Sequence, residues 1–202
     1  LPFHNEFWAS DNTDPFSRLY IQFATNLMYP PKATASHVTI SPNHQTGNTS
    51  SLKFRFDVAM MGRLGIELQP KDLSKSELNF VKQSISTYKK LRPIVAFGDW
   101  YPLHSPYNTD KYAATQFVSK DKKESLLFAF SLDFHPRTFM PNFKLAGLNK
   151  DKEYKIVEQN IVDKQSFWGN NMSFTGDYLM TVGVNLNILL RGESTLLYLQ
   201  EQ

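Results

Sequence analysis

The segment Phe7-Trp8-Ala9-Ser10-Asp11-Asn12-Thr13-Asp14-Pro15 joins a short apolar run to the start of a helix. Asp14 has the side chain of a helix N-cap, and proline is preferred at the first helical position that follows. Leu19, Phe23 and Leu27 then recur every fourth residue, which places them on one helix face. The segment therefore predicts a strand, a polar loop and a helix in succession.

The same succession occurs twice more in the following sequence. Short apolar alternations predict the strands, turn residues predict the loops, and apolar spacings of three and four predict the helices. The last helix can be capped by Asp72 or Ser74, and we expect it to end near Arg92-Pro93 because proline disrupts a helix interior. The predicted elements are a strand at 37–40, a loop at 41–48, a helix at 51–61, a strand at 64–68 and a helix containing Leu78, Val81, Ile85 and Tyr88.

From Phe97 onward the sequence shows only short β-type runs between turns. We therefore predict two domains, 1–96 and 97–202, the second an antiparallel β-sandwich without an amphipathic helix. The predicted strands are 114–119, 125–132, 143–145, 154–158, 179–184 and 195–199.

Three strand–helix units cannot close a barrel or cover both faces of a parallel sheet. The first domain is therefore interpreted as the last three βα units of a (β/α)₈ barrel whose other units precede Leu1. The expected fold class is α/β plus all-β, and the chain is expected to be part of a longer polypeptide.

The composition excludes several classes of function. Basic and acidic residues number 22 and 19 without clustering, so the charge pattern expected of a nucleic-acid binder is missing. No run approaches the ~18 apolar residues of a membrane span. The absence of cysteine excludes thiolate metal sites and leaves the cellular compartment undetermined. His37, His104 and His135 have no partner at metal-ligand spacing, so neither a metal nor another cofactor is expected.

The loop after Phe7 carries two carboxylates beside an aromatic residue, at a strand end before a helix. In a β/α barrel this is the catalytic face. By spacing alone, the favoured interpretation is a polar loop in which Asp14 only caps the helix.

A series of motifs in fixed order resembles glycoside hydrolase family 36, the bacterial and fungal α-galactosidases. Residues 7–14 resemble the Trp-x-Ser-Asp-x-Thr-Asp segment of that family. The resemblance continues in register over about half of the chain, and a looser one at 173–180 is similar to the family's C-terminal sandwich. The matching segments are Arg18-Leu19-Tyr20-Ile21-Gln22, Tyr29-Pro30-Pro31, His37-Val38, Ser41-Pro42-Asn43-His44-Gln45-Thr46-Gly47 and Met60-Met61-Gly62-Arg63-Leu64-Gly65.

The resemblance implies that Asp11 is the general acid/base of a retaining glycosidase. It also implies that the nucleophilic aspartate, in a Lys-x-Asp segment, and a glycine-rich sugar loop lie upstream of this chain. Retaining hydrolysis needs two carboxyl groups about 5–5.5 Å apart, so Asp11 supplies only one of them and the isolated chain is expected to be inactive.

Three other side chains near Asp11 are open to more than one interpretation. Trp8 is either an apolar wall beside the sugar or a packing residue. His44 is either a structural loop residue or part of the rim of the active site. Some family members have an arginine four residues before the acid, where this chain has Phe7, which leaves the contact to the sugar's 2-substituent open.

The expected function is removal of terminal α-galactose from raffinose-type oligosaccharides. An α-N-acetylgalactosaminidase of the same family and a non-catalytic carbohydrate-binding domain are the alternatives. The expected partners are the sugar substrate and the upstream part of the same polypeptide, with no nucleic acid and no membrane. The resemblance is also compatible with a homo-oligomer.

Overall fold

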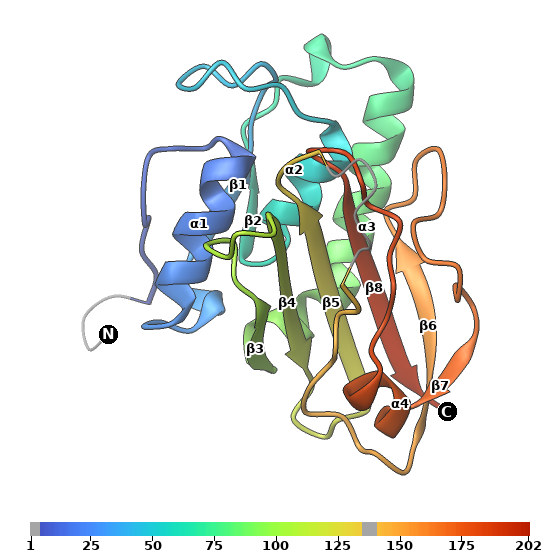
Figure 1. Ribbon diagram of the computed structural model, residues 1–202. Helices are drawn as coiled ribbons and strands as arrows, with labels where there is room; N and C mark the ends of the chain where they lie inside the picture. The colour runs from blue at the N-terminus through green and yellow to red at the C-terminus, as the bar shows by residue number, and fades with distance from the viewer. Residues whose placement is uncertain (1–4, 135–140) are drawn as a thin grey trace.

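The first part of the chain alternates parallel strands with helices (Figure 1). The computed structural model describes residues 5–134 and 141–202. Strands β1 and β2 pair in parallel, from Ala35 opposite Arg63 to Val38 opposite Ile66, and Phe7 forms a parallel bridge with Thr34. The elements are α1 (Pro15–Asn26), η1 (Pro31–Ala33), β1 (Ala35–Val38), α2 (Leu52–Ala59), β2 (Arg63–Ile66), η2 (Pro70–Asp72) and α3 (Lys75–Phe97).

Each of the three α-helices begins at a capping residue that the sequence indicates. Asp14 caps α1 with Pro15 at its first position, as predicted, and Ser51 caps α2. Of the two candidates for α3, Ser74 is the cap: its side chain accepts from the backbone N–H of Glu77, and the Glu77 side chain accepts from that of Ser74. This reciprocal pair satisfies two backbone donors that a helix start leaves free.

Helix α3 is longer than the sequence suggested. The predicted end near Arg92-Pro93 is wrong, because the helix continues through Pro93 to Phe97. Beyond the proline, Ile94 and Val95 are almost fully buried and belong to the main hydrophobic core. Burial of these two side chains offsets the backbone hydrogen bond that Pro93 cannot make.

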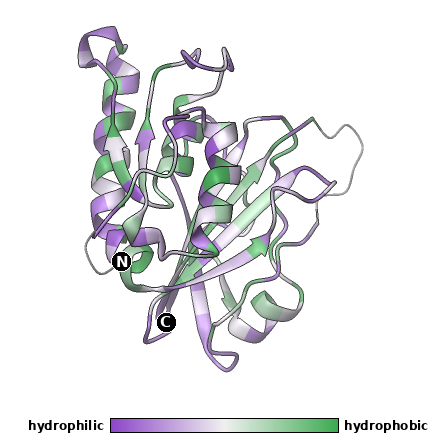
Figure 2. Cartoon of the chain, turned by 90° about the vertical axis from the view of Figure 1, so that its left-hand side faces the viewer, coloured by the Kyte–Doolittle hydropathy of each residue, from purple (hydrophilic) through white to green (hydrophobic). Residues whose placement is uncertain are grey.

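The second part of the chain forms one antiparallel sheet of six strands, in the order β3-β4-β5-β8-β6-β7. Its strands are β3 (Asp99–His104), β4 (Tyr112–Val118), β5 (Glu124–Ser131), β6 (Glu153–Gln159), β7 (Ser173–Thr175) and β8 (Ser194–Glu201). Figure 2 shows hydrophobic residues along these strands.

The prediction of a β-sandwich is wrong, because the described residues of this part form one sheet and not two. Every residue of β4 is buried, which requires cover on both faces of the sheet. One face packs on helices α2 and α3 in a core where Phe54 lies edge-on to Phe130, with ring centroids 5.7 Å apart. The other face is covered by irregular segments that contribute, among others, Phe143, Leu145, Phe167, Leu186 and Ile188.

Two of the predicted strands are not strands. The run at 179–184 overlaps the short helix α4 (Gly176–Thr181), six residues that the strand prediction did not anticipate. The Thr175 hydroxyl accepts from the backbone N–H of Tyr178 and starts this helix, while Leu179 is fully buried. The other run, at 143–145, contributes only an isolated bridge between Phe143 and Val184.

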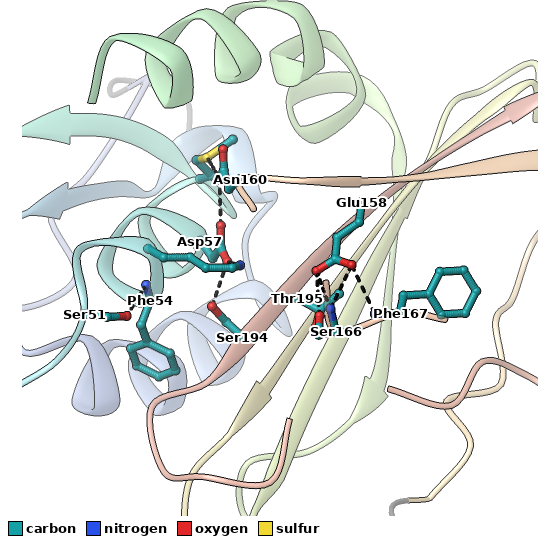
Figure 3. A network of polar contacts seen from close by, with 11 residues as sticks. Ser51, Phe54, Asp57, Glu158, Asn160, Ser166, Phe167, Ser194 and Thr195 are labelled. Atoms are coloured by element: carbon teal, nitrogen blue, oxygen red, sulfur yellow. Dashed lines mark hydrogen bonds and ion pairs between the residues drawn. The ribbon is translucent and has the colours of Figure 1, made fainter. Parts of the chain in front are cut away.

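A buried carboxylate joins the two parts of the chain (Figure 3). Asp57 of α2 is fully buried and accepts hydrogen bonds from Lys53 at 2.5 Å, from Asn160 after β6 at 2.7 Å and from Ser194 at the start of β8 at 2.7 Å. This network and the main apolar core both contain residues from before and after residue 97. The division into two domains, 1–96 and 97–202, stays a prediction.

Candidate active site

The carboxyl ends of three neighbouring parallel segments lie at one edge of the small sheet. Trp8 follows the bridge at Phe7, His37 lies near the end of β1, and Glu67 follows β2. Parallel pairing brings these ends together, and in α/β folds this edge is where functional side chains gather. Asp11 lies in the loop that leaves the first of the three segments.

Asp11 is exposed and held by one side chain. Its Oδ1 accepts a hydrogen bond of 2.9 Å from the indole N–H of Trp8. The loop around it is fixed by local contacts: the backbone N–H of Asn12 donates to Ser10 Oγ, and that of Asp14 donates to Asn12 Oδ1. Asp11 therefore presents a carboxylate on an ordered loop, with one oxygen without a donor from the described residues.

Asp14 has a different environment, three residues further on. It is 1% exposed, and its carboxylate accepts from the backbone N–H of Phe16 at 3.4 Å, from Ser17 Oγ at 3.2 Å and from Asn48 Nδ2 at 2.7 Å. The prediction that Asp14 is the helix N-cap is confirmed. With both oxygens engaged, this carboxylate supports the loop and has no access to a substrate.

These environments predict effects of different size on the free energy of unfolding. Asp14→Ala should lower the free energy of unfolding by about 1–2 kcal/mol, because it removes an N-cap and leaves Asn48 without its acceptor. Asp11→Ala should change it by less than about 0.5 kcal/mol, as is usual for an exposed position. Urea unfolding of the two variants measures both values, and equal losses would contradict the assignment.

The loop at 41–48 supports the Asp11 loop from the next strand. Gln45 Oε1 accepts from the backbone N–H of Thr13 at 3.3 Å, and Asn43 Nδ2 donates to Thr13 Oγ1 at 3.2 Å. His44, between them in sequence, is exposed. Both neighbours of His44 contact Thr13 of the Asp11 loop, and a role of His44 at the rim of the active site stays a prediction.

The ring of Trp8 packs against the His37 imidazole and the Arg18 guanidinium. Its centroid lies 4.5 Å from that of His37, and the Arg18 guanidinium lies 5.3 Å from the ring on the helix side. Trp8 itself is 37% exposed, so it is a packing residue with a free portion of its surface. Both interpretations of Trp8 from the sequence are compatible with this placement.

His37 is fixed in turn by β2. Its Nδ1 lies 2.5 Å from Glu67 Oε1. Gly65 lies opposite His37 in the parallel ladder, and a Cβ atom at Gly65 would come within 2.2 Å of His37 Cδ2. Glycine is therefore required there for the imidazole to lie flat across the strand.

Arg18 of helix α1 links the Asp11 loop to strand β1 through hydrogen bonds. Its guanidinium is almost fully buried and donates to the carbonyl of Ser10 at 3.3 Å, to that of Ala35 at 2.9 Å and to Gln22 Oε1 at 3.3 Å. Burial lowers the pKa of Arg18 to about 10, because removal from water disfavours the charged form. Its hydrogen bonds to the two carbonyls fix the position of the loop that carries Asp11.

The sequence did not single out His37, Glu67 or Arg18 as site residues. For His37 and Glu67 the signal is the strand period of two: His37 pairs with Gly65, and Arg63 and Glu67 lie two residues to either side of Gly65, as expected for one polar face of the sheet. In residues 5–134 and 141–202, no three His, Cys, Asp or Glu side chains come together as a metal site. His135 lies outside the described residues. No helix in the same ranges is long and apolar enough to cross a membrane.

Strands followed by helices, with a carboxylate at their carboxyl edge, are typical of the catalytic part of β/α enzymes, and two family models identify the class. The Melibiase model matches residues 1–98, and the model of the glycosyl hydrolase family 36 C-terminal domain matches residues 112–199. The chain belongs to glycoside hydrolase family 36.

Curated relatives match most of this chain but extend well beyond it. Alpha-galactosidase 1 of Pediococcus pentosaceus is 39% identical over 86% of the chain, and alpha-galactosidase AgaA of Geobacillus stearothermophilus is 38% identical over 89%. The matched region is 23% of each relative, so the chain spans about a quarter of their length.

Solved structures show the same arrangement of elements. The family 36 α-galactosidase AgaB of Geobacillus stearothermophilus is 36% identical, with a TM-score of 0.87 over 98% of this chain and 26% of its own. A variant of AgaA from the same organism, in complex with raffinose, is 35% identical, with a TM-score of 0.86 over 96% of this chain and 25% of its own.

Proposed function

We propose that the protein to which this chain belongs is a retaining α-galactosidase and that Asp11 is its general acid/base. The observation that supports this role is the contrast between two neighbouring carboxylates. Asp11 is exposed at the carboxyl edge of the strands with one oxygen lacking a donor among the described residues, whereas Asp14 is buried and fully engaged.

The first step forms a glycosyl ester. A carboxylate nucleophile attacks the anomeric carbon, the bond from that carbon to the leaving oxygen breaks, and the Asp11 carboxyl gives its proton to that oxygen. The family resemblance assigns the nucleophile to a segment outside this chain. Among the described residues, the hydrogen bond to Asp11 comes from an indole and not from a second carboxyl.

The second step returns both carboxyl groups to their first state. Water attacks the anomeric carbon and gives a proton to the Asp11 carboxylate, the ester bond breaks and the nucleophile leaves as a carboxylate. Two displacements at one carbon give a product with the α configuration of the substrate.

The proposed substrates are raffinose-type oligosaccharides with a terminal α-galactose. Variants of AgaA have been solved with raffinose and with stachyose, and they are 35% and 36% identical to this chain. Phe7, where some family members have arginine, contacts the ring of Tyr29 at 4.9 Å. A contact to the sugar's 2-substituent must therefore come from another residue, and the choice between galactose and N-acetylgalactosamine is left to experiment.

Paired assays test the proposal. The full-length polypeptide should release galactose from raffinose, and proton NMR should detect α-galactose before mutarotation. The isolated chain of 202 residues should show no turnover with an aryl α-galactoside, since a retaining mechanism needs the second carboxyl group. Initial release of β-galactose, or faster cleavage of an aryl α-N-acetylgalactosaminide, would contradict the proposal. Steady turnover by the isolated chain would show that the nucleophile lies within it.

A further inference from the structure

The two oxygens of the Asp11 carboxylate are not equivalent. Oδ1 accepts the indole N–H of Trp8 at 2.9 Å, while Oδ2 has no hydrogen-bond donor among the described residues. An oxygen that accepts a fixed N–H is disfavoured as the site of a proton, because the proton would face the donor. The proton of a neutral Asp11 therefore belongs on Oδ2.

The indole that donates this hydrogen bond is itself in contact with two other side chains. The centroid of the Trp8 ring lies 4.5 Å from that of the His37 imidazole and 5.3 Å from the guanidinium of Arg18. Arg18 is buried and donates to the carbonyl of Ser10, the residue directly before Asp11. The orientation of the indole and the position of the carboxylate are thus set by the same guanidinium.

The imidazole is fixed by the neighbouring strand. Glu67 Oε1 lies 2.5 Å from His37 Nδ1, and Gly65 leaves the space that the ring occupies. Contacts therefore run without interruption from Glu67 to His37, then to Trp8 and to Asp11 Oδ1. They join three parallel segments that the chain brings together only on folding.

We propose that Trp8 is a positioning residue for proton transfer: its N–H holds Asp11 Oδ1 so that Oδ2 gives and receives the proton, and His37 with Glu67 holds the indole. The inference rests on the proposed function. In the first step the proton on Oδ2 moves to the leaving oxygen as the glycosidic bond breaks. In the second step a proton of the attacking water moves to Oδ2 as the ester bond breaks.

The substitution Trp8→Phe in the full-length enzyme tests the role, because it keeps an aromatic ring and removes the N–H. We expect kcat/KM for raffinose to fall by about 10–100-fold, the effect of a lost hydrogen bond to a charged group and of a displaced catalytic group. For an aryl galactoside with an acidic phenol, which leaves with little protonation, kcat/KM should fall by less than about threefold.

Galactose inhibition separates this role from that of a sugar wall. The inhibition constant of free galactose should stay within about twofold in Trp8→Phe, since the ring face is kept. Trp168→Phe is the matched control, because it makes the same change at an indole that is 64% exposed on the second part of the chain, and it should behave as the wild type. Equal losses for both substrates, or wild-type kinetics in Trp8→Phe, would overturn the inference.

Two substitutions at His37 test the support of the indole. His37→Ala should reproduce the dependence on the leaving group seen in Trp8→Phe, since the indole loses its packing partner. His37→Phe keeps a ring against Trp8 and should recover most of the rate for raffinose. If the two variants are equally impaired for every leaving group, His37 has a general structural role and the inference fails.

The outcome is distinguishable from a failure of the proposed function. If the wild-type enzyme does not cleave α-galactosides, or if Asp11→Asn leaves the rate on raffinose unchanged, the proposed function itself is wrong. If both of those controls behave as expected and Trp8→Phe does not, only the positioning role is wrong.

Discussion

Asp11→Asn in the full-length enzyme should lower kcat/KM for raffinose by about 10²–10⁴-fold while the fold is kept. The amide cannot give a proton to the leaving sugar alkoxide. It still accepts from the indole N–H of Trp8 through its carbonyl oxygen, so the geometry of the loop should survive. Unchanged urea unfolding, measured beside the kinetics, would show that the loss is chemical.

The choice of substrate makes this test specific to the acid/base role. An acidic phenol leaves with little protonation, so the first step with an aryl galactoside should be much less affected than that with raffinose. The second step needs a base for either substrate. The variant should therefore show a burst of phenol followed by slow turnover.

Azide and a control variant complete the experiment. Azide attacks without help from a base, so it should speed turnover of the variant and yield an α-galactosyl azide. Asp151→Asn, at an exposed position before β6, should retain wild-type kinetics. Equal slowing of both substrates, without a burst and without azide rescue, would remove Asp11 as the acid/base.

Asp57→Ala should lower the free energy of unfolding of the chain by about 2–4 kcal/mol. The change leaves Lys53, Asn160 and Ser194 without their shared acceptor. The Lys53 side chain is 16% exposed and can turn to water, which limits the loss, but the amide and the hydroxyl stay largely enclosed. Urea unfolding followed by tryptophan fluorescence measures the change.

A double-mutant cycle tests whether this network joins the two parts of the chain. Asp57 lies on α2, Ser194 begins β8, and their oxygens are 2.7 Å apart. The pair Asp57→Ala and Ser194→Ala should show a coupling of about 0.5–3 kcal/mol. Asp151→Asn serves again as the exposed control and should change stability by less than about 0.5 kcal/mol. Additive losses at Asp57 and Ser194 would contradict a direct link.

The starts of the α1, α2 and α3 helices could be predicted because their signals are local. Asp14 with Pro15, Ser51 and Ser74 satisfy backbone donors within a few residues of themselves, so neighbouring sequence is enough to identify them. Thr175 gives the same kind of signal for α4, whereas the apolar alternation at 179–184 predicts a strand there. A capping residue is the stronger evidence when the two signals conflict over so short a run.

The sequence by itself determined the order of strands and helices in the first part, Asp14 as the cap of the first helix, the family and Asp11 as the candidate acid. Tertiary structure alone decided the passage of α3 through Pro93, the single sheet in place of a sandwich, and the meeting of Trp8, His37 and Glu67 beside Asp11. The physical reason is the separation in sequence between the residues that make each contact. Caps and periodicity depend on contacts a few residues apart, whereas the packing that buries Ile94 and covers both sheet faces depends on segments far apart in the chain.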